Sequence, residues 1–330
     1  GGFFDSEHWI LENIETIRRN GLELDGVTPE EKVSVKNAKT MHLTEMQDLS
    51  RQKPIDIAFV SMKSYDTEWA TALIKQYLAP DGYVVSLQNC LNEERIAGVV
   101  GWGKTVGMIA SLISVDMFEP ARIRRTVAKG GDKHTVFRVG EVHGRITSRV
   151  EELRDMVGRI DSAKTTTNLW GERWAKLCQN GMKNGVSAAT RLTGSDCDRN
   201  DAIRRFSIKL GGEAVRVGQA LGYHIEKIGK MEPETLAKAS EGDKAALDEI
   251  ETIMRPGSNT NPNPRADIQR PSMAQDIRKG RRTEIEFMNG YIAERGNYIG
   301  VPAPTHAKLT EIVKKVGRRE VKAAPALLGG

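Results

Sequence analysis

Blocks of apolar and polar residues alternate over the first 147 residues as in an α/β domain. Apolar positions at helical spacing from Ile10 to Ile17, closed by Gly21, predict a helix after a short initial strand, GGFFD. The near-continuous apolar runs at 55–62 and 83–89 predict parallel strands that are covered on both faces, with the amphipathic segment TEWATALIKQYL between them as a helix. We therefore predict a Rossmann-like, mostly parallel sheet in residues 1–147.

The pattern changes to helical spacing from about residue 148 onward. Alternation with Gly-Gly-Asp turn signals at 120–145 predicts antiparallel strands that close the sheet just before this change. After it, amphipathic segments follow one another, and 233–254 and 272–296 are each predicted as one continuous helix on either side of a Pro/Asn-rich loop. We therefore predict an all-helical second domain at 148–330.

The stretch GVVGWGKT, residues 98–105, fits the phosphate-loop pattern G-x-x-x-x-G-K-[ST] at every position. That pattern binds phosphate only when a buried strand leads into the loop and a helix follows it. Here NEERIAG precedes it as a helix and a β-branched apolar run follows it as a strand. The order is reversed, so we interpret this stretch as a helix-to-strand connection, not as a triphosphate site.

Composition and charge exclude several classes of function. The chain of 330 residues has a net charge of +5 with basic and acidic residues interspersed, and only 5% of its residues are aromatic, so no nucleic-acid partner is expected. It has neither an apolar run long enough to span a membrane nor a secretory segment at its start. Three cysteines without C-x-x-C spacing and six histidines without H-x-x-x-H pairs predict a reduced, cytoplasmic protein without a metal site.

Polar residues at three places form the candidate site. Lys63 and Asn89 follow the two predicted strands, where ligands bind in parallel sheets; a solvated lysine and a helix-capping asparagine are the alternative. Lys176, Asn180 and Asn184 are four residues apart, so all three project along one stripe of a helix. This stripe is either a solvent edge or a cleft wall suited to an oxygen-rich substrate.

A serine and a glutamate twelve residues apart complete the set. Ser272 is followed by an apolar-periodic run, so it is a helix N-cap in the simplest interpretation. Glu284 has arginines nearby in the sequence with which it can pair.

Four motifs together resemble the ketopantoate reductases (2-dehydropantoate 2-reductases): VSMKSYDT, SLQNCLNEERI, WAKLCQNGMKNG and PSMAQDIRKGRRTEIEFMNG. They occur in order from about residue 3 to 316. The resemblance implies a dinucleotide-binding domain, a helical domain and reduction of a 2-oxo acid, 2-dehydropantoate to pantoate, by NADPH. It places the protein in pantothenate biosynthesis, with a small 2-oxo acid as its partner, and we consider a homodimer as its assembly.

The resemblance also implies a role for each candidate residue. Lys176 matches the general acid that protonates the carbonyl oxygen, and Glu284 matches a catalytic glutamate that engages cofactor and substrate. Asn180, Asn184 and Ser272 match substrate-binding positions. Lys63 and Asn89 match positions on the cofactor side.

The beginning of the sequence departs from the family pattern. The family opens with a strand and a G-x-G-x-x-G loop that binds pyrophosphate, and neither occurs here, so we expect the given sequence to lack about one β-α unit. Asp5 ends the next predicted strand, where a carboxylate accepts hydrogen bonds from the ribose of NAD and repels a 2′-phosphate. NADP is therefore the first expectation for the cofactor, and NAD is the alternative.

Two substitutions bear on the substrate. Cys90 replaces a glycine after the cofactor-side asparagine, and Gln269 replaces a substrate-binding asparagine. These departures favour a relative that acts on a different 2-oxo acid as one alternative. A catalytically silent binding protein on the same scaffold is the other, because the glycine loop is absent from the given sequence.

Overall fold

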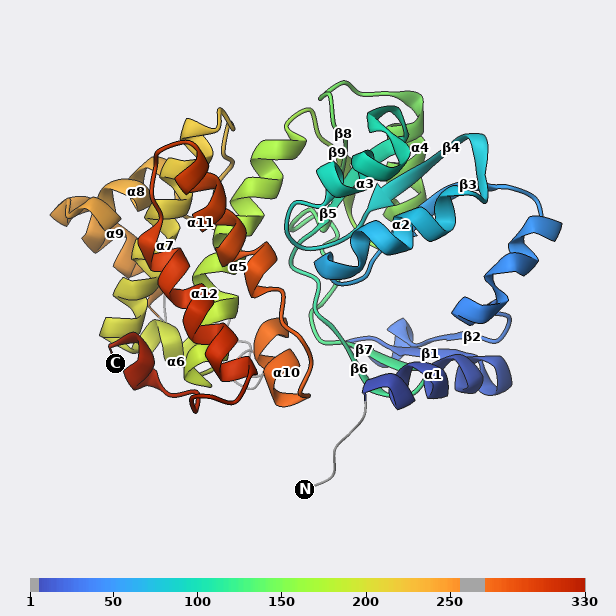
Figure 1. Ribbon diagram of the computed structural model, residues 1–330, viewed down its shortest axis with the longest axis horizontal. Helices are drawn as coiled ribbons and strands as arrows, with labels where there is room; N and C mark the ends of the chain where they lie inside the picture. The colour runs from blue at the N-terminus through green and yellow to red at the C-terminus, as the bar shows by residue number, and fades with distance from the viewer. Residues whose placement is uncertain (1–5, 256–270, 330) are drawn as a thin grey trace. The chain divides into compact units, whose positions relative to one another are not determined.

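The computed structural model describes residues 6–255 and 271–329, with side chains from Glu12 onward. The chain forms two compact units, each coloured by residue number in Figure 1. Unit 1 comprises the residues up to Met62 together with Asp66–Gln88 and Asn92–Leu169. Unit 2 begins at Trp170 and includes two short segments from earlier in the chain, Lys63–Tyr65 and Asn89–Leu91. The predicted boundary between two domains at residues 147 and 148 stays a prediction.

Unit 1 is built on a five-stranded sheet whose first three strands are parallel. Strand β8 runs antiparallel to β5, and β9 runs parallel to β8. The strands lie in the order β3 (Ile55–Val60), β4 (Leu78–Ser86), β5 (Thr105–Ala110), β8 (Phe137–Glu141) and β9 (Ala163–Thr165). The mostly parallel, Rossmann-like sheet expected from the apolar runs is thereby confirmed.

Helices cover both faces of this sheet, which explains why its strands are apolar without alternation. On one face Val85 packs in a cluster with Val150 and Leu153 of α4 (Ser148–Gly158). On the other face Val84 packs with Ile96 of α3 (Glu93–Val100). Helix α2 (Thr67–Lys75) connects β3 to β4 and lies beside α3 (Figure 1).

A smaller sheet in unit 1 takes up strands that the sequence pattern assigned to the main one. Its order is β2 (Val33–Val35), β1 (Leu22–Asp25), β7 (Arg122–Arg125) and β6 (Val115–Glu119), and α1 (Ser6–Asn20) precedes it. The prediction of antiparallel strands at 120–145 is right for β7 and β8, but they do not close the edge of one sheet, because β9 lies outside β8. Strand β8 pairs with β5 in the main sheet, whereas β7 pairs with β1 and β6.

The stretch GVVGWGKT has the helix–turn–strand order that its flanks predict. Helix α3 ends at Val100, a 3-10 turn η4 spans Trp102–Lys104, and β5 begins at Thr105. The Lys104 ammonium donates hydrogen bonds to the carbonyls of Ala79 (3.2 Å) and Pro80 (2.6 Å). This lysine ties a turn to the neighbouring strand, so the phosphate-loop match has a structural explanation.

Unit 2 is helical, as the sequence pattern predicts. Its core is one continuous apolar cluster that includes the fully buried Trp174. The helices are α5 (Leu169–Thr190), α6 (Gly194–Arg199), α7 (Asp201–Ala220), α8 (Pro233–Glu241), α9 (Lys244–Met254), α10 (Ser272–Arg278), α11 (Asn289–Tyr298) and α12 (Pro304–Gly317). The other 3-10 turns among the described residues are η1 (Pro29–Glu31), η2 (Leu43–Arg51), η3 (Ser64–Asp66), η5 (Ile285–Phe287) and η6 (Pro325–Leu328).

Two predicted helices are each broken at a glycine with left-handed backbone. Gly242 (φ +100°) separates α8 from α9, and Gly280 (φ +67°) ends the segment that begins with α10. Glycine adopts this conformation without a steric penalty, so a helix ends there even when apolar periodicity continues. The prediction of one helix over 272–296 is wrong, and Glu284 lies at the start of η5.

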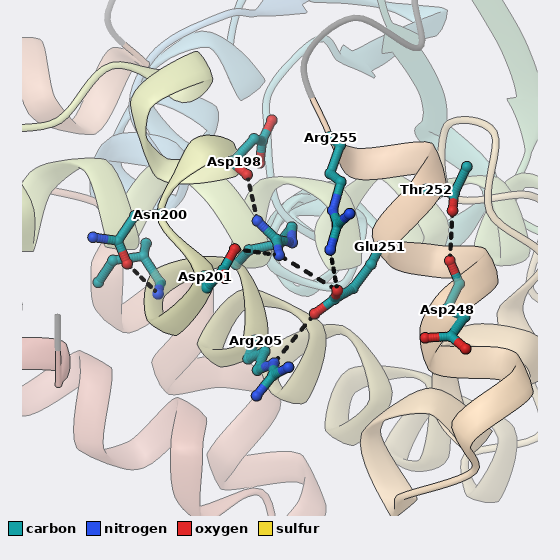
Figure 2. Close-up of polar contacts among 10 residues, drawn as sticks. Asp198, Asn200, Asp201, Arg205, Asp248, Glu251, Thr252 and Arg255 are labelled. Carbon is teal, nitrogen blue, oxygen red and sulfur yellow. Dashed lines mark hydrogen bonds and ion pairs between the residues drawn. The ribbon is translucent and has the colours of Figure 1, made fainter.

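A buried arginine joins α6, α7 and α9 through the network in Figure 2. Arg204 is 2% exposed and donates to the Asp198 carbonyl (2.9 Å) and to the Asp201 carboxylate (2.6 Å). Glu251 accepts hydrogen bonds from Arg205 and Arg255, and its carboxylate lies 3.4 Å from Arg204. Although burial raises the pKa of Glu251, these arginines outweigh it and lower that pKa. The network keeps buried charges paired at the edge of the helical core.

Trp174 of α5 is buried where this helix packs closely against α7. Its indole Nε1 donates to the Ala214 carbonyl (2.8 Å), and its ring packs against Tyr223 with centroids 5.2 Å apart. A Cβ added at Gly218 would lie 2.1 Å from the indole nitrogen. The absence of a side chain at Gly218 is thus what allows α7 to pack on α5.

Gly218→Ala is therefore expected to lower the free energy of unfolding by about 1–3 kcal/mol, the usual cost of overpacking a core. Chemical denaturation followed by tryptophan fluorescence measures it. The control is Gly194→Ala in the first turn of α6, where an added Cβ meets nothing within 4 Å. Equal stability of the two variants would contradict the packing argument.

A buried histidine holds the middle of α5 against three other helices. His306 is fully buried on α12, and its Nε2–H donates to the Leu210 carbonyl (2.8 Å). The amide Nδ2 of Asn289 donates both to His306 Nδ1 (3.0 Å) and to the Gly181 carbonyl (3.0 Å). Burial lowers the pKa of His306 to about 4, so the imidazole is neutral near pH 7.

This depressed pKa predicts a loss of stability in acid. The unfolded chain binds a proton at His306 near pH 6.5, whereas the folded chain resists it down to about pH 4. The stability that the neutral imidazole contributes is complete above pH 6.5 and falls as pH drops toward 4, by about 3 kcal/mol in total.

Unfolding free energies measured between pH 7 and pH 4 should show this step in the native sequence and in the control His143→Gln, whose side chain is exposed. His306→Gln should be less stable at pH 7 and should lack the step. An identical pH profile in the His306 variant would refute the assignment.

Candidate active site

Two buried carboxylates surround the ammonium of Lys63 within unit 2. Lys63 Nζ lies 2.6 Å from Asp276 Oδ2 and 3.4 Å from Glu284 Oε2. Asp276 and Glu284 are each 5% exposed, while the Lys63 side chain keeps about a third of its surface accessible. Lys63 lies three residues after the end of β3 in the sequence, and its ammonium pairs with α10 and with the residue before η5.

The cluster has more negative than positive charge, and the pKa values reflect this excess. Burial lowers the pKa of Lys63, but the charges of Glu284 and Asp276 outweigh burial and raise it. The pKa of Asp276 is also raised, because burial and the charge of Glu284 exceed the opposing effect of Lys63. Both shifts have the sign expected when two carboxylates share one ammonium.

The glutamate is further fixed by the residue after Lys63. Ser64 donates to Glu284 Oε1 from its backbone nitrogen (2.9 Å) and from its hydroxyl (2.8 Å). Tyr65 then lies under the guanidinium of Arg282 (4.7 Å to the ring centroid). Three consecutive residues thus bind the segment around Glu284, and its carboxylate has a defined orientation.

Cys90 lies among the charged groups of the site. It is 5% exposed and adopts φ +66°, a conformation that usually favours glycine. Its pKa is raised to about 12, first by burial and then by the charge of Glu284, against a hydrogen bond from Ser64 and the positive charges of Lys176 and Arg173. Glu284 and Lys176 thus shift the pKa of this thiol in opposite directions.

The stripe predicted on α5 exists, because residues 169–190 form one uninterrupted helix. Lys176 and Asn180 are half-buried and Asn184 is buried, so the stripe is not a solvated edge. Asn180 Nδ2 donates to Asn89 Oδ1 at 3.4 Å. This contact connects the stripe to the segment that follows β4.

Ser272 is exposed and is the first residue of α10, with Pro271 at the N-cap position, so it is not the predicted N-cap. It lies four residues before Asp276 and therefore on the same side of α10. Helix α10 thus presents a hydroxyl and the Lys63-binding carboxylate along one stripe.

The sequence patterns missed Asp276 and Ser64. Asp276 stands at i+4 from Ser272, the same spacing that singled out the α5 stripe, and this signal was present in PSMAQD. Ser64 carries no signal of its own beyond its position after Lys63. Asp5 and Gln269 lie outside the described residues.

Metal-ligating side chains do not cluster in the described part of the chain: no group of three or more His, Cys, Asp or Glu there could hold an ion. Within the same residues no helix is long and apolar enough to cross a bilayer. All three cysteines are buried, and burial raises the pKa of each thiol.

Removal of one carboxylate should change the protonation of Lys63. In Asp276→Asn the pKa of Lys63 is expected to fall, because burial then opposes the ammonium with one carboxylate left to stabilise it. An NMR titration of the Lys63 side chain measures this. Glu286→Gln is the control, since Glu286 is half-exposed and pairs with Arg282 and Lys314 instead. An unchanged Lys63 pKa in Asp276→Asn would contradict the described charge cluster.

Comparison with protein-family models matches both parts of the chain. Residues 8–135 match the model described as ketopantoate reductase PanE/ApbA, and residues 168–317 match its C-terminal counterpart. Among curated proteins, 2-dehydropantoate 2-reductase of Archaeoglobus fulgidus is 27% identical over 273 residues, covering 81% of this chain and 78% of the relative. The enzyme of the same name from Pyrococcus horikoshii is 27% identical and covers 92% and 86%.

Solved structures show the same fold. A PanE/ApbA family ketopantoate reductase from Ralstonia eutropha superposes with a TM-score of 0.71 at 22% identity, covering 94% of this chain and 89% of that one. D-mandelate dehydrogenase with NADH and anilino(oxo)acetate superposes with a TM-score of 0.71 at 17% identity and the same coverage. With two family models matched in order along its length, the chain belongs to the ketopantoate reductase PanE/ApbA family.

Proposed function

We propose that this protein reduces a 2-oxo acid to the corresponding 2-hydroxy acid with NAD(P)H, and that 2-dehydropantoate is the substrate. The observations that carry the proposal are two contacts within unit 2: Lys63 lies 3.4 Å from Glu284, and the Asn180 amide donates to Asn89. These residues come from four segments far apart in the sequence. Their side chains offer the ammonium and amide groups that a small carboxylate and carbonyl compound requires.

The residues after β3 and β4 suit the polar end of a dinucleotide. Lys63 and Asn89 follow β3 and β4 in the sequence, and dinucleotides bind beyond the carboxyl ends of adjacent parallel strands such as these. Lys63 supplies a cation and Asn89 an amide, a donor set that fits the nicotinamide ribose end of the cofactor. When bound, NAD(P)H supplies the hydride that the carbonyl carbon accepts. NADPH is the first expectation, and NADH is the alternative because of Asp5.

Lys176 is the proposed general acid. A lysine ammonium is charged at neutral pH and can stabilise the negative charge that develops on the carbonyl oxygen. It then transfers its proton to that oxygen, which yields the hydroxyl of the product. Its half-buried position on α5 strengthens this interaction, because a charge acts more strongly where water is partly excluded.

The amides and hydroxyl orient the substrate in this proposal. Asn180 and Asn184 stand one and two turns after Lys176, so groups that bind the substrate carboxylate and side chain follow the acid along one stripe. Ser272 contributes a hydroxyl from α10. Glu284, held by Ser64 and Lys63, keeps a fixed acceptor for hydroxyl or amide donors of the bound compounds.

A different 2-oxo acid is the second candidate substrate. Cys90 puts a side chain at φ +66° directly after Asn89, where the family pattern has glycine, so it fills space that glycine leaves empty. Activity of the purified protein with a panel of 2-oxo acids, each tested with NADPH and NADH at 340 nm, distinguishes the two substrates. If no 2-oxo acid leads to oxidation of NADPH or NADH, the result would favour a catalytically silent binding protein. A homodimer stays a prediction.

Lys176→Ala should lower kcat about 10²- to 10⁴-fold, the usual contribution of general acid catalysis, or roughly 3–5 kcal/mol of barrier. The control is Lys183→Ala on the same helix, an exposed lysine whose carboxylate partner Asp198 is 3.5 Å away. Its kcat should stay within about twofold. A Lys176 variant with native kcat would remove this residue from the mechanism.

A further inference from the structure

A cavity of about 380 Å³ opens on the surface of unit 2, apart from the residues of the proposed active site. Its walls come from the end of α5, from α10, from the end of α12 and from the C-terminal segment after α12 (dark red in Figure 1). A hydrogen bond from the Ala324 nitrogen to the Ala189 carbonyl (3.0 Å) holds that segment against α5. The volume lies in the range of small-molecule sites, about 300–1,000 Å³.

Four cationic side chains line this cavity, and none of its described lining residues is acidic. They are exposed at the rim and come from three places, the residue after α5, the end of α10 and the segment after α12: Arg191, Arg278, Arg319 and Lys322. The nearest acid along the chain, Glu320, is bound by Arg318 (2.5 Å). The rim thus gathers charge of one sign.

The floor of the cavity is apolar. Ala188, Ala274 and Val316 are buried there, with relative exposures of 2–6%, and Ile277 lies beside them. An apolar floor under a cationic rim matches a ligand with an uncharged ring or chain at one end and several negative charges at the other.

Two of the arginines hold backbone conformations that are unfavourable for them. Arg191 has φ +64° directly after α5, and Arg319 has φ +63° shortly after α12. Glycine is the usual residue at such positions behind a helix, since a Cβ there is strained. Strain that persists in a structure is concentrated at functional positions.

The partial negative charges at the helix ends do not cancel the positive charge of the rim. Helices α5, α10 and α12 all end at this cavity, and each carboxyl end carries about half a negative charge, so together they supply at most about −1.5. Four side-chain cations exceed this sum, so the described lining is positive and suits an anionic ligand.

We propose that this cavity binds an organic polyphosphate of nucleotide type, with the phosphates at the four cations and the uncharged part on the apolar floor. Asp276, which binds Lys63, does not line it, so the two sites use different sides of α10.

Isothermal titration with ADP and with inorganic pyrophosphate tests the proposal at low ionic strength, where exposed charges are least screened. The test variant carries Arg191→Gly and Arg319→Gly, which remove two cations and relieve two strained backbones at once. Its dissociation constant for ADP should rise about tenfold or more, while its melting temperature should not fall. This combination separates lost binding from lost folding.

The control carries Lys279→Gln and Lys308→Gln, which remove two exposed cations from α10's end and from α12 outside the cavity. It should bind ADP within about twofold of the native protein. Absent ADP binding, or equal weakening in both variants, would overturn the proposal. Pyrophosphate that binds as tightly as ADP would overturn the role of the apolar floor.

Discussion

Two carboxylates buried around a single ammonium are the constraint on which the site depends. Asp276 and Glu284 lose most of their contact with water, and a buried charge is stable only when it is paired and hydrogen-bonded. Lys63 and Ser64 supply those partners within unit 2, and so they hold α10 and the segment around Glu284. The negative charge that remains favours binding of further hydrogen-bond donors or cations at this cluster.

Helix α5 connects this charge cluster to the rest of unit 2. Near its beginning Trp174 packs where Gly218 leaves room, and at its middle the Asn289–His306 pair binds the Gly181 carbonyl. Asn180, the neighbour of that carbonyl, contacts Asn89. Close contacts between uncharged groups thereby hold α5 in place. In the proposed reaction the polar side chains of this helix face the substrate, and such a reaction requires that they be positioned precisely.

Helix α10 is shared by the proposed reductase site and the proposed anion site. Ser272 and Asp276 follow one side of it, whereas Ala274, Ile277 and Arg278 line the cavity. The two sites differ in their electrostatics. Buried carboxylates dominate around Lys63, while exposed cations surround the cavity. Ligands of different charge are therefore expected to bind at different sites, even though both sites lie on one helix of seven residues.

The sequence by itself determined what depends on neighbours a few residues away. Apolar runs gave the parallel strands, i+4 spacing gave the stripe of Lys176, Asn180 and Asn184, and the flanks of GVVGWGKT excluded a phosphate loop. Only the tertiary structure decided the non-local pairings. Asp276 meets Lys63 across 213 residues, and β7 joins β1 instead of the main sheet. Periodicity records which face of a helix or strand is buried, whereas a partner is selected by the packing of the whole chain, and that information is spread over residues that no local window contains together.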